Sequence, residues 1–313
     1  MQNLTQIKGD ASFRKFFRRK KKNYNSILVF AKKEKLKNLL IYDAINKILD
    51  KNKILAPKLY KENYKKNFIE IQDFGNETIF KILKRKKINK LIYFKKIILL
   101  LIKIQSIKNR KIKNFKNKNY VIPKYDKKIL IKEANLFCDW YIKNDLLKIK
   151  KDKFNREFKK IILHLSNNLK LKNNIFVHRD FHISNLMLIN NRIGLIDSQD
   201  ALIGNRAYDL ASLIDDVRLK TPELLKKKIF NFYIKKQKNL NFKKFKNDFE
   251  ILSVLRNLKI IGIFTRLAIR DGKKKYLNLI PYAWTLINLR INQNEVFNDL
   301  KKLFNENLKI KIQ

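Results

Sequence analysis

The sequence predicts an α+β fold in which a small β-rich part, residues 1–74, precedes a larger helical part, residues 75–313. Short apolar and aromatic runs bounded by turn residues dominate the first part, whereas apolar residues recur at helical spacing through most of the second. Strands grouped before helices are typical of α+β proteins. The sequence has no Gly/Ser-rich or Pro-rich linker and no visible internal repeat, so the two parts are expected to form one domain.

The N-terminal part is expected to contain four strands and one helix. A basic, aromatic strand and an apolar strand (SILVFA) flank a turn at residues 23–25. Apolar residues with a helical period follow, and Ala56-Pro57 closes that region. The predicted elements are strands at 13–19 and 26–31, a helix at 33–49, and strands at 58–61 and 68–72.

The C-terminal part is expected to be mostly helical. Asn76 is the predicted cap of a first helix that starts near Glu77, and the basic segment 110–118 is the predicted exposed connector. Further helices are predicted at 88–107, 128–142, 154–169, 209–217, 222–236, 242–269 and 277–293, with an amphipathic helix in the last twenty residues.

The most informative stretch, FVHRDFHISNLMLINNRIGLIDSQD, spans residues 176–200. An apolar strand leads into a polar loop, two short apolar strands follow around a turn, and acidic residues come last. A lone Asp or Asn in a loop is usually a turn or capping residue. The joint pattern of Asp180, Asn185 and Asp197 in this strand context instead favours phosphoryl transfer from a magnesium-bound nucleotide.

Each of the three residues has a predicted role in that chemistry. Asp180 is expected to orient a substrate hydroxyl and to accept its proton. Asn185 and Asp197 offer the hard oxygen ligands that Mg²⁺ prefers. The loop between Asp180 and Asn185, and the strand pair that returns Asp197, are expected to aim all three side chains into one cleft.

Several motifs resemble those of the aminoglycoside phosphotransferase superfamily, which shares the protein-kinase fold. HRDFHISNLM, IDSQDA and AYDLASLIDD carry this resemblance, whereas GDASFRKFFR, EANLFCDWYI and LRNLKIIGIFTRLAIRDGKKKYL are similar to one branch of it. That branch comprises bacterial kinases that phosphorylate the anomeric hydroxyl of N-acetylmuramate and N-acetylglucosamine. The resemblance implies a bilobal protein-kinase-like fold, with ATP and Mg²⁺ as cofactors and an amino sugar as the small-molecule acceptor.

The resemblance also implies where a nucleotide binds. Gly9, Ser12 and Arg14 belong to the short loop expected to cover the phosphates, although a single glycine there also fits an ordinary turn. Gln72, Asp73 and Phe74 resemble the hinge whose backbone hydrogen-bonds adenine. Asp73-Phe74-Gly75 therefore only mimics the metal-binding tripeptide of protein kinases, and Asp197 is the expected metal aspartate.

Two residues are expected to support the catalytic loop by analogy with the family. His178 is predicted to brace the loop backbone, and Asp209 to tie the loop down from a helix, with a helix N-cap as the alternative. Two departures from the family pattern stand out. Ser198 replaces the usual aromatic residue after the metal aspartate, and strand 26–31 lacks a lysine, so Arg14, Lys32 or Lys33 are alternative sources of the positive charge.

The acceptor site is the least defined. Glu133 is a candidate to accept a hydrogen bond from a sugar hydroxyl, although a solvated helix glutamate is commoner. Arg266 and Arg256 are candidates to meet a carboxylate such as the lactyl group of muramate, or are surface charges. An aminoglycoside, choline or a related amino alcohol is the alternative acceptor, but a cationic ligand needs carboxylates or an aromatic cage.

Charge suggests a further, non-catalytic function. The chain has 74 Lys and Arg against 27 Asp and Glu, a net charge of +47. A nucleic-acid-binding protein is therefore an alternative, but a binding footprint is clustered, whereas these lysines are spread over the whole chain. We expect compositional drift, no specific nucleic-acid partner, and a monomer.

The remaining composition indicates the compartment. The single cysteine, Cys138, excludes an internal disulfide, fits a reducing compartment and is expected to be buried. The N-terminus does not resemble a secretory signal, and the most apolar run, residues 97–102, is too short to span a bilayer. We expect a cytoplasmic protein without a membrane partner.

Overall fold

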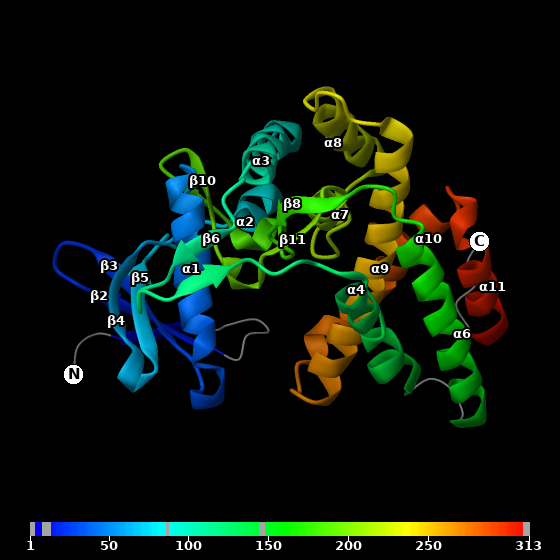
Figure 1. The fold of residues 1–313 in the computed structure, drawn as a ribbon, viewed down its shortest axis with the longest axis horizontal. Coiled ribbons are helices and arrows are strands. Elements are labelled where there is room, and N and C mark those ends of the chain that lie inside the picture. The colour runs from blue at the N-terminus through cyan, green and yellow to red at the C-terminus, as the bar shows by residue number, and fades with distance from the viewer. Residues whose placement is uncertain (1–3, 8–13, 86–87, 144–147, 309–313) are drawn as a thin grey trace. The chain divides into compact units, whose positions relative to one another are not determined.

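A computed structural model describes residues 4–7, 14–85, 88–143 and 148–308 (Figure 1). The chain forms two compact units. The first comprises Met1–Pro123 and Ile175–Ile203, and the second Lys124–Asn174 and Gly204–Gln313. These boundaries follow packing and differ from the predicted division at residue 74, which stays a prediction.

The first unit is built on a five-stranded antiparallel sheet with the order β1-β2-β3-β5-β4. Its strands are β1 (Leu4–Ile7), β2 (Lys15–Lys20), β3 (Asn25–Phe30), β4 (Leu59–Asn63) and β5 (Phe68–Gln72). The apolar runs thus form the strands that the sequence predicted. The edge strand β1 was not predicted, because Leu-Thr-Gln-Ile is short and mostly exposed.

Helix α1 (Lys37–Lys51) packs against one face of this sheet (Figure 1). Side chains alternate across a strand, so Ile27 and Val29 of β3 share a face with Ile69 and Ile71 of β5. Leu39 of α1 completes this cluster, and its helical spacing with Tyr42 places both on the sheet side. The position of α1 matters because Tyr42 also reaches the candidate site.

The rest of the first unit adds two helices and short hairpins. They are α2 (Ile79–Lys84), α3 (Lys90–Gln105), β6 (Lys111–Lys113) with β7 (Asn119–Val121), and β9 (Leu186–Ile189) with β10 (Arg192–Leu195). Thr78, not Asn76, caps α2 by accepting the N–H of Lys81. The prediction that segment 110–118 is an exposed connector is wrong in part, because Ile112 and Asn114 are buried. The Asn114 side chain accepts the Lys116 N–H in the turn of the β6–β7 hairpin.

The second unit is helical. It contains α4 (Lys127–Ala134), a π-helical turn (Phe137–Ile142), α6 (Lys148–Asn167), α7 (Ala207–Ile214), α8 (Glu223–Lys235), α9 (Phe242–Ile269), α10 (Ile280–Ile291) and α11 (Asn298–Asn307). Phe137 lies in its core with the rings of Phe158 and Trp284 at 5.5 and 5.7 Å. The paired strands β8 (Asn173–Val177) and β11 (Leu202–Asn205) carry the chain between the units.

The predicted continuous helix at 128–142 is interrupted. Gly262 of α9 lies so close to the backbone of Leu136 that a Cβ at this position would come within 2.3 Å of the Leu136 carbonyl. The absent side chain lets α9 approach the turn where α4 gives way to the π-helical segment. Sequence periodicity does not reveal this tertiary contact.

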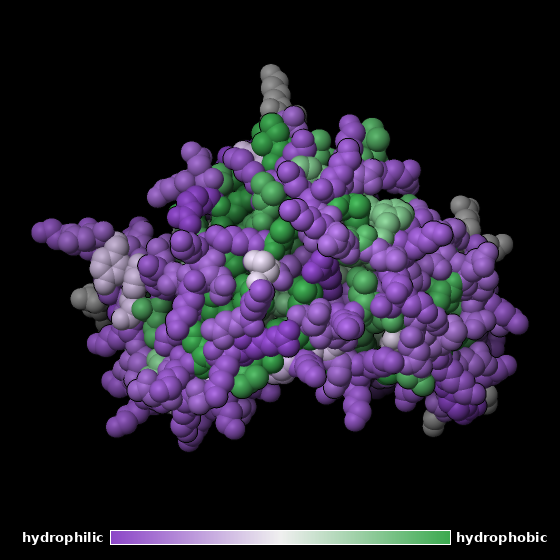
Figure 2. All heavy atoms as spheres, turned by 45° about the horizontal axis from the view of Figure 1, so that its top comes forward, coloured by the Kyte–Doolittle hydropathy of each residue, from purple (hydrophilic) through white to green (hydrophobic). Residues whose placement is uncertain are grey.

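One face of the molecule is largely polar. Hydrophilic residues cover most of the face drawn in Figure 2, with smaller apolar areas between them. Among the described residues, no helix combines the length and apolar character needed to cross a membrane.

Candidate active site

The loop after β8 carries Asp180 and is braced by its own hydrogen bonds. The Asn185 side-chain amide donates to the Asp180 carbonyl (3.1 Å), and the His182 N–H donates to the same oxygen (3.0 Å). Arg179 adopts a left-handed conformation with a φ of 72°, which is costly for a residue with a Cβ. Its guanidinium donates to the Asp200 carbonyl (3.1 Å), a contact that helps to hold this turn.

The β9–β10 hairpin returns the chain to the same place, as the sequence predicted. The Ile196 N–H donates to the Asn185 carbonyl (3.0 Å), so Asp197 follows directly after a residue bonded to Asn185. Asp197 is itself left-handed, with a φ of 64°. The structure thus brings the segments of Asp180, Asn185 and Asp197 together within the first unit.

Arg14 contacts the predicted metal aspartate. Its guanidinium donates to Asp197 Oδ1 (2.5 Å) and to Gln199 Oε1 (2.8 Å), and only 5% of the residue is exposed. The rings of Phe16 and Tyr42 lie 5.5 and 5.7 Å from the guanidinium carbon. Of the three alternative cations for the missing strand lysine, Arg14 is therefore the one that reaches this site, whereas Lys32 and Lys33 are exposed.

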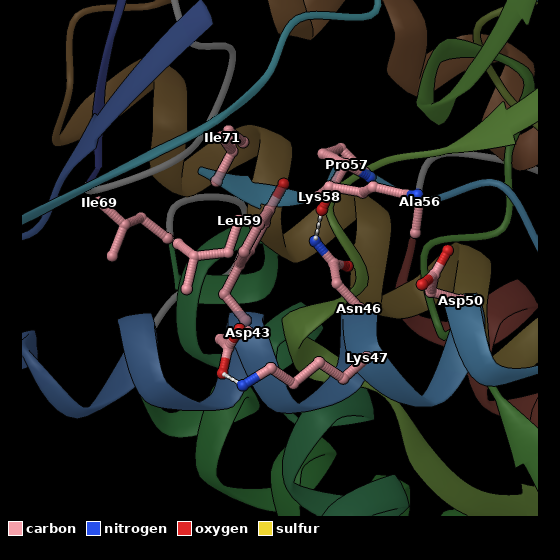
Figure 3. A pocket seen from close by; sticks show the side chains of 11 residues that line it. Asp43, Asn46, Lys47, Asp50, Ala56, Pro57, Lys58, Leu59, Ile69 and Ile71 are labelled. Atoms are coloured by element: carbon pink, nitrogen blue, oxygen red, sulfur yellow. Dashed lines mark hydrogen bonds and ion pairs between the residues drawn. The ribbon is translucent and has the colours of Figure 1, made fainter. Parts of the chain in front are cut away.

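The loop after Asp197 is anchored by a polar contact in place of an aromatic one. Ser198 is fully buried, and its hydroxyl donates to Asn46 Oδ1 on α1. The Asn46 amide nitrogen in turn donates to the Pro57 carbonyl (3.1 Å; Figure 3). This chain of hydrogen bonds explains how the loop is held although the family's usual aromatic residue is absent.

A pocket of about 230 Å³ lies between α1 and the strands β4 and β5 (Figure 3). Asp43 and Lys47 form an ion pair (2.8 Å) along α1, and burial raises the pKa of the Asp43 carboxyl. Tyr42 and Asn46 also line this pocket. Burial raises the pKa of Tyr42 to about 12, so its hydroxyl stays protonated beside Arg14. Helix α1 therefore links the pocket to the Asp197 loop through Tyr42, whose ring lies beside Arg14, and through Asn46, which accepts from Ser198.

Removing the Ser198 hydroxyl is expected to destabilise the protein by about 1–3 kcal/mol, because Asn46 Oδ1 would stay buried without its donor. Ser198→Ala tests this by urea denaturation. Ser106→Ala is the matched control, because its exposed hydroxyl donates only to the Lys103 carbonyl, and its effect should stay below about 0.5 kcal/mol. Equal stabilities of the two variants would show that the Asn46 contact does not anchor the loop.

The predicted hinge is fastened to β2 by an arginine that the sequence analysis missed. Arg18 donates from Nε and Nη2 to the two carboxylate oxygens of Asp73 (2.5 and 2.9 Å). It also donates to the Gly75 carbonyl (3.0 Å) and to Asn76 Oδ1 (2.7 Å). The signal was present in the sequence, because Arg14, Phe16 and Arg18 occupy alternate positions, the spacing of one strand face, and Arg14 directly precedes β2.

The supporting residues are buried. His178 is fully buried, and burial lowers the pKa of its imidazole, which favours the neutral form expected of a structural histidine. Asp209 is fully buried in the first turn of α7, in the second unit. Arg206 occupies the N-cap position of α7, so the alternative N-cap role of Asp209 is wrong.

The predicted acceptor residues lie in the second unit. The Glu133 carboxylate accepts hydrogen bonds from the Tyr125 hydroxyl and from Lys259 (2.9 Å). It is therefore held within the protein rather than solvated. Arg266 is half-buried on α9, and its Nε has no hydrogen-bond partner among the described residues. Gly9 and Ser12 lie outside the described residues.

Comparison with known proteins identifies the family. A model of the "phosphotransferase enzyme family" matches residues 3–238. The chain belongs to this family. It is a kinase that transfers a phosphoryl group to a hydroxyl acceptor.

Two curated relatives resemble this phosphotransferase over most of its length. One, from Neisseria meningitidis serogroup B, is 29% identical over 89% of this chain and 83% of its own. Another, from Pseudomonas putida, is 26% identical over 97% of this chain and 88% of its own. Both are named N-acetylmuramate/N-acetylglucosamine kinase.

Solved structures confirm the predicted fold class. A Plasmodium vivax ethanolamine kinase superposes with a TM-score of 0.63, at 14% identity, covering 95% of this phosphotransferase and 83% of that chain. The gentamicin–APH(2")-IIa complex gives 0.63 at 16% identity, covering 90% and 91%. At such identities the likeness shows the protein-kinase-like fold alone. A spectinomycin phosphotransferase in complex with ADP and spectinomycin also superposes (TM-score 0.58, 13% identity, 90% and 92% covered).

Proposed function

We propose that this phosphotransferase is a Mg²⁺-dependent ATP kinase of a cell-wall amino sugar, N-acetylmuramate or N-acetylglucosamine, acting at the anomeric hydroxyl. The observation that supports the catalytic part is the backbone hydrogen bond from Ile196 to Asn185, which joins the segments of Asn185 and Asp197, the two proposed oxygen ligands, beside the Asp180 loop. The names of the curated relatives support the acceptor. A monomeric, cytoplasmic enzyme remains our prediction.

The donor set fits Mg²⁺. Asn185 and Asp197 supply one amide and one carboxylate, and Mg²⁺ usually takes one or two carboxylates and keeps waters and substrate phosphates as its other ligands. When bound, the ion would neutralise phosphate charge. Asp180 would orient the acceptor hydroxyl and take its proton, so that positioning and electrostatics dominate.

The nucleotide would lie along the α1-facing side of β2. Arg18 lies on this face of β2, and Arg14 directly precedes the strand, four residues from Arg18, which corresponds to about 13 Å of extended chain. Arg14 contacts Asp197 at one end, and Arg18 contacts the hinge at the other, so triphosphate and adenine would occupy opposite ends. The predicted phosphate contacts of Gly9 and Ser12 belong to the same loop as Arg14.

The hinge segment offers backbone groups for adenine. The Gln72 N–H donates to the Lys58 carbonyl (2.8 Å) and is thereby used within the sheet. The adenine hydrogen bonds predicted for this segment would therefore come chiefly from the backbone of Asp73 and Phe74, while the Asp73 side chain is held by Arg18.

Arg18→Met is expected to raise the KM for Mg·ATP about tenfold with little change in kcat, because the hinge would lose four hydrogen bonds while the catalytic loop stays intact. Steady-state kinetics with varied ATP measure this. Arg19→Met is the matched control. Arg19 lies on the opposite face of β2 and donates to Glu70 (3.2 Å), which keeps Lys21 and Ser26 as partners. Similar KM values for Mg·ATP in Arg18→Met and Arg19→Met would contradict the proposed position of the nucleotide along β2.

The acceptor side is proposed to include Glu133 and Arg266. A cationic acceptor such as an aminoglycoside or choline would need free carboxylates. In the second unit, Glu133 is paired with Lys259, and Asp215 is paired with Lys226 and Arg290. These pairs favour an acceptor without positive charge.

A substrate panel tests the proposal. Purified protein with Mg·ATP is assayed against N-acetylmuramate, N-acetylglucosamine, aminoglycosides and choline, with Asp180→Ala as the catalytic control. We expect transfer to an amino sugar, nearly abolished in the variant. Turnover of an amino alcohol or aminoglycoside without turnover of either sugar would transfer the assignment to the alternative acceptor. Polyanion binding at physiological salt that does not need Asp180, without any turnover, would favour the nucleic-acid alternative.

A further inference from the structure

Four lysine and arginine residues in the described part of the chain are at least nine-tenths buried. Arg14, Lys226, Arg256 and Arg290 are 5%, 4%, 4% and 9% exposed. Three of them are paired with carboxylates: Arg14 with Asp197 (2.5 Å), and Lys226 and Arg290 with Asp215 (2.8 and 2.9 Å). Arg256 is the exception.

The Arg256 guanidinium has no hydrogen-bond or ion-pair partner among the described residues, and its Nη1 is fully buried. The residues three positions away on α9, which are neighbours on a helix surface, already have polar partners of their own. On one side, Ser253 donates to Asp215 (2.6 Å), whose carboxylate already binds Lys226 and Arg290. On the other side, Lys259 donates to Glu133.

An unpaired guanidinium in this position is unfavourable for folding. Arginine cannot lose its proton in a protein, so Arg256 carries its charge although it is 96% buried, as its exposed fraction of 4% implies. A buried charge without a partner destabilises a fold strongly, and native proteins pair such charges. Residues that conflict with stability in this way are typical of binding sites.

We propose that Arg256 is the carboxylate-binding residue of the acceptor site and selects N-acetylmuramate over N-acetylglucosamine. This inference rests on the proposed function. The two sugars differ by a lactyl ether, which gives the muramate a carboxylate that the other sugar lacks. A planar guanidinium fork binds a carboxylate with two parallel hydrogen bonds.

Another predicted acceptor residue, Glu133, is held by a residue one turn of α9 away from Arg256. Lys259, one turn along α9, holds Glu133, and Glu133 accepts from Tyr125. The Tyr125 ring lies 5.0 Å from that of Tyr208 on α7, and the Tyr208 hydroxyl is buried without a hydrogen-bond partner among the described residues. The second unit thus contains two buried donors without a hydrogen-bond partner among the described residues, the Arg256 guanidinium and the Tyr208 phenol, which suit the carboxylate and a hydroxyl of an acidic sugar.

The test is Arg256→Met, which keeps the length of the apolar stem and removes the charge. We expect the KM for N-acetylmuramate to rise about 30-fold, with kcat and the KM values for N-acetylglucosamine and Mg·ATP almost unchanged. Arg256→Lys should recover part of the loss. Arg270→Met, at the exposed end of α9 where Arg270 pairs with Asp271, should leave the KM for both sugars unchanged.

The unfolding temperature separates a binding role of Arg256 from a structural one, because the two roles predict shifts of opposite sign in Arg256→Met. Arg256→Met should unfold at a higher temperature than the parent protein, because an unpaired buried charge is removed. Arg290→Met, which removes a paired buried charge, should unfold at a lower temperature. A lower unfolding temperature for Arg256→Met, equal losses on both sugars, or a change confined to the KM for Mg·ATP would each overturn the proposal.

Failure of the proposed function is distinguishable from failure of this inference. If the parent protein phosphorylates neither sugar, the amino-sugar assignment fails. In that case, isothermal titration calorimetry with D-lactate tests the anion site directly. If the parent protein binds D-lactate and Arg256→Met does not, Arg256 belongs to a carboxylate site for another acceptor. If neither protein binds D-lactate, or both bind it equally, the proposed role of Arg256 is overturned.

Discussion

Asp180→Asn is expected to lower kcat for phosphoryl transfer about 1,000-fold while the KM for Mg·ATP changes little. The amide keeps the size of the side chain but cannot accept the proton of the acceptor hydroxyl, and such proton transfer contributes about 10²–10⁴-fold. The Asp180 backbone carbonyl accepts the hydrogen bonds of Asn185 and His182 that brace the loop, and the substitution leaves this carbonyl in place, so the loop conformation should persist. The measurement is steady-state transfer to the sugar that the parent protein uses.

The control for this variant is Asp152→Asn, an exposed aspartate on α6 in the second unit. Both changes remove one negative charge from a chain of net charge +47, so a general charge effect would appear in both. Transfer by Asp180→Asn within a few-fold of the control would exclude Asp180 as the proton acceptor.

Asp197→Asn is expected to abolish Mg²⁺-dependent nucleotide binding and to lower transfer by about 1,000-fold or more, because the site loses its only carboxylate ligand in the proposed donor set. Fluorescence titration with a labelled ATP analogue, with Mg²⁺ and with EDTA, measures the binding. The same Mg²⁺ dependence in parent and variant would show that another residue holds the metal.

The fold should also respond to this change. Arg14 is buried and donates to Asp197 Oδ1, so the asparagine replaces the charged acceptor of this ion pair with a neutral one. We expect a loss of stability of about 1–3 kcal/mol, and about 3–5 kcal/mol for Asp197→Ala, which leaves no acceptor there. The double variant Arg14→Met/Asp197→Asn should recover much of the stability lost in Asp197→Asn. The absence of this recovery would contradict a stabilising ion pair between Arg14 and Asp197.

Local patterns explain what the sequence predicted well. Helix α9 spans Phe242–Ile269, the bounds predicted from its apolar period. The chain from Asp180 through the β9–β10 hairpin to Asp197 is also local, since strand pairs and turns between nearby residues fix it. Sequence motifs are therefore informative where the interacting groups are close in the chain.

Contacts between distant residues explain what the sequence did not predict. Ser198 and Asn46 are separated by 152 positions, and Arg18 and Asp73 by 55. The chain after α4 lies against Gly262, which belongs to the distant helix α9. Periodicity describes one element at a time and carries no information about which element it meets.

The sequence by itself determined the family motifs, the strand-then-helix order and the identity of the three residues proposed for phosphoryl transfer. Only the tertiary structure decided that Arg14 reaches Asp197, that Arg18 holds the hinge and that Arg256 is buried without a counter-ion. The physical reason is that burial and pairing are properties of the space around a side chain. Packing between elements far apart in the sequence creates that space.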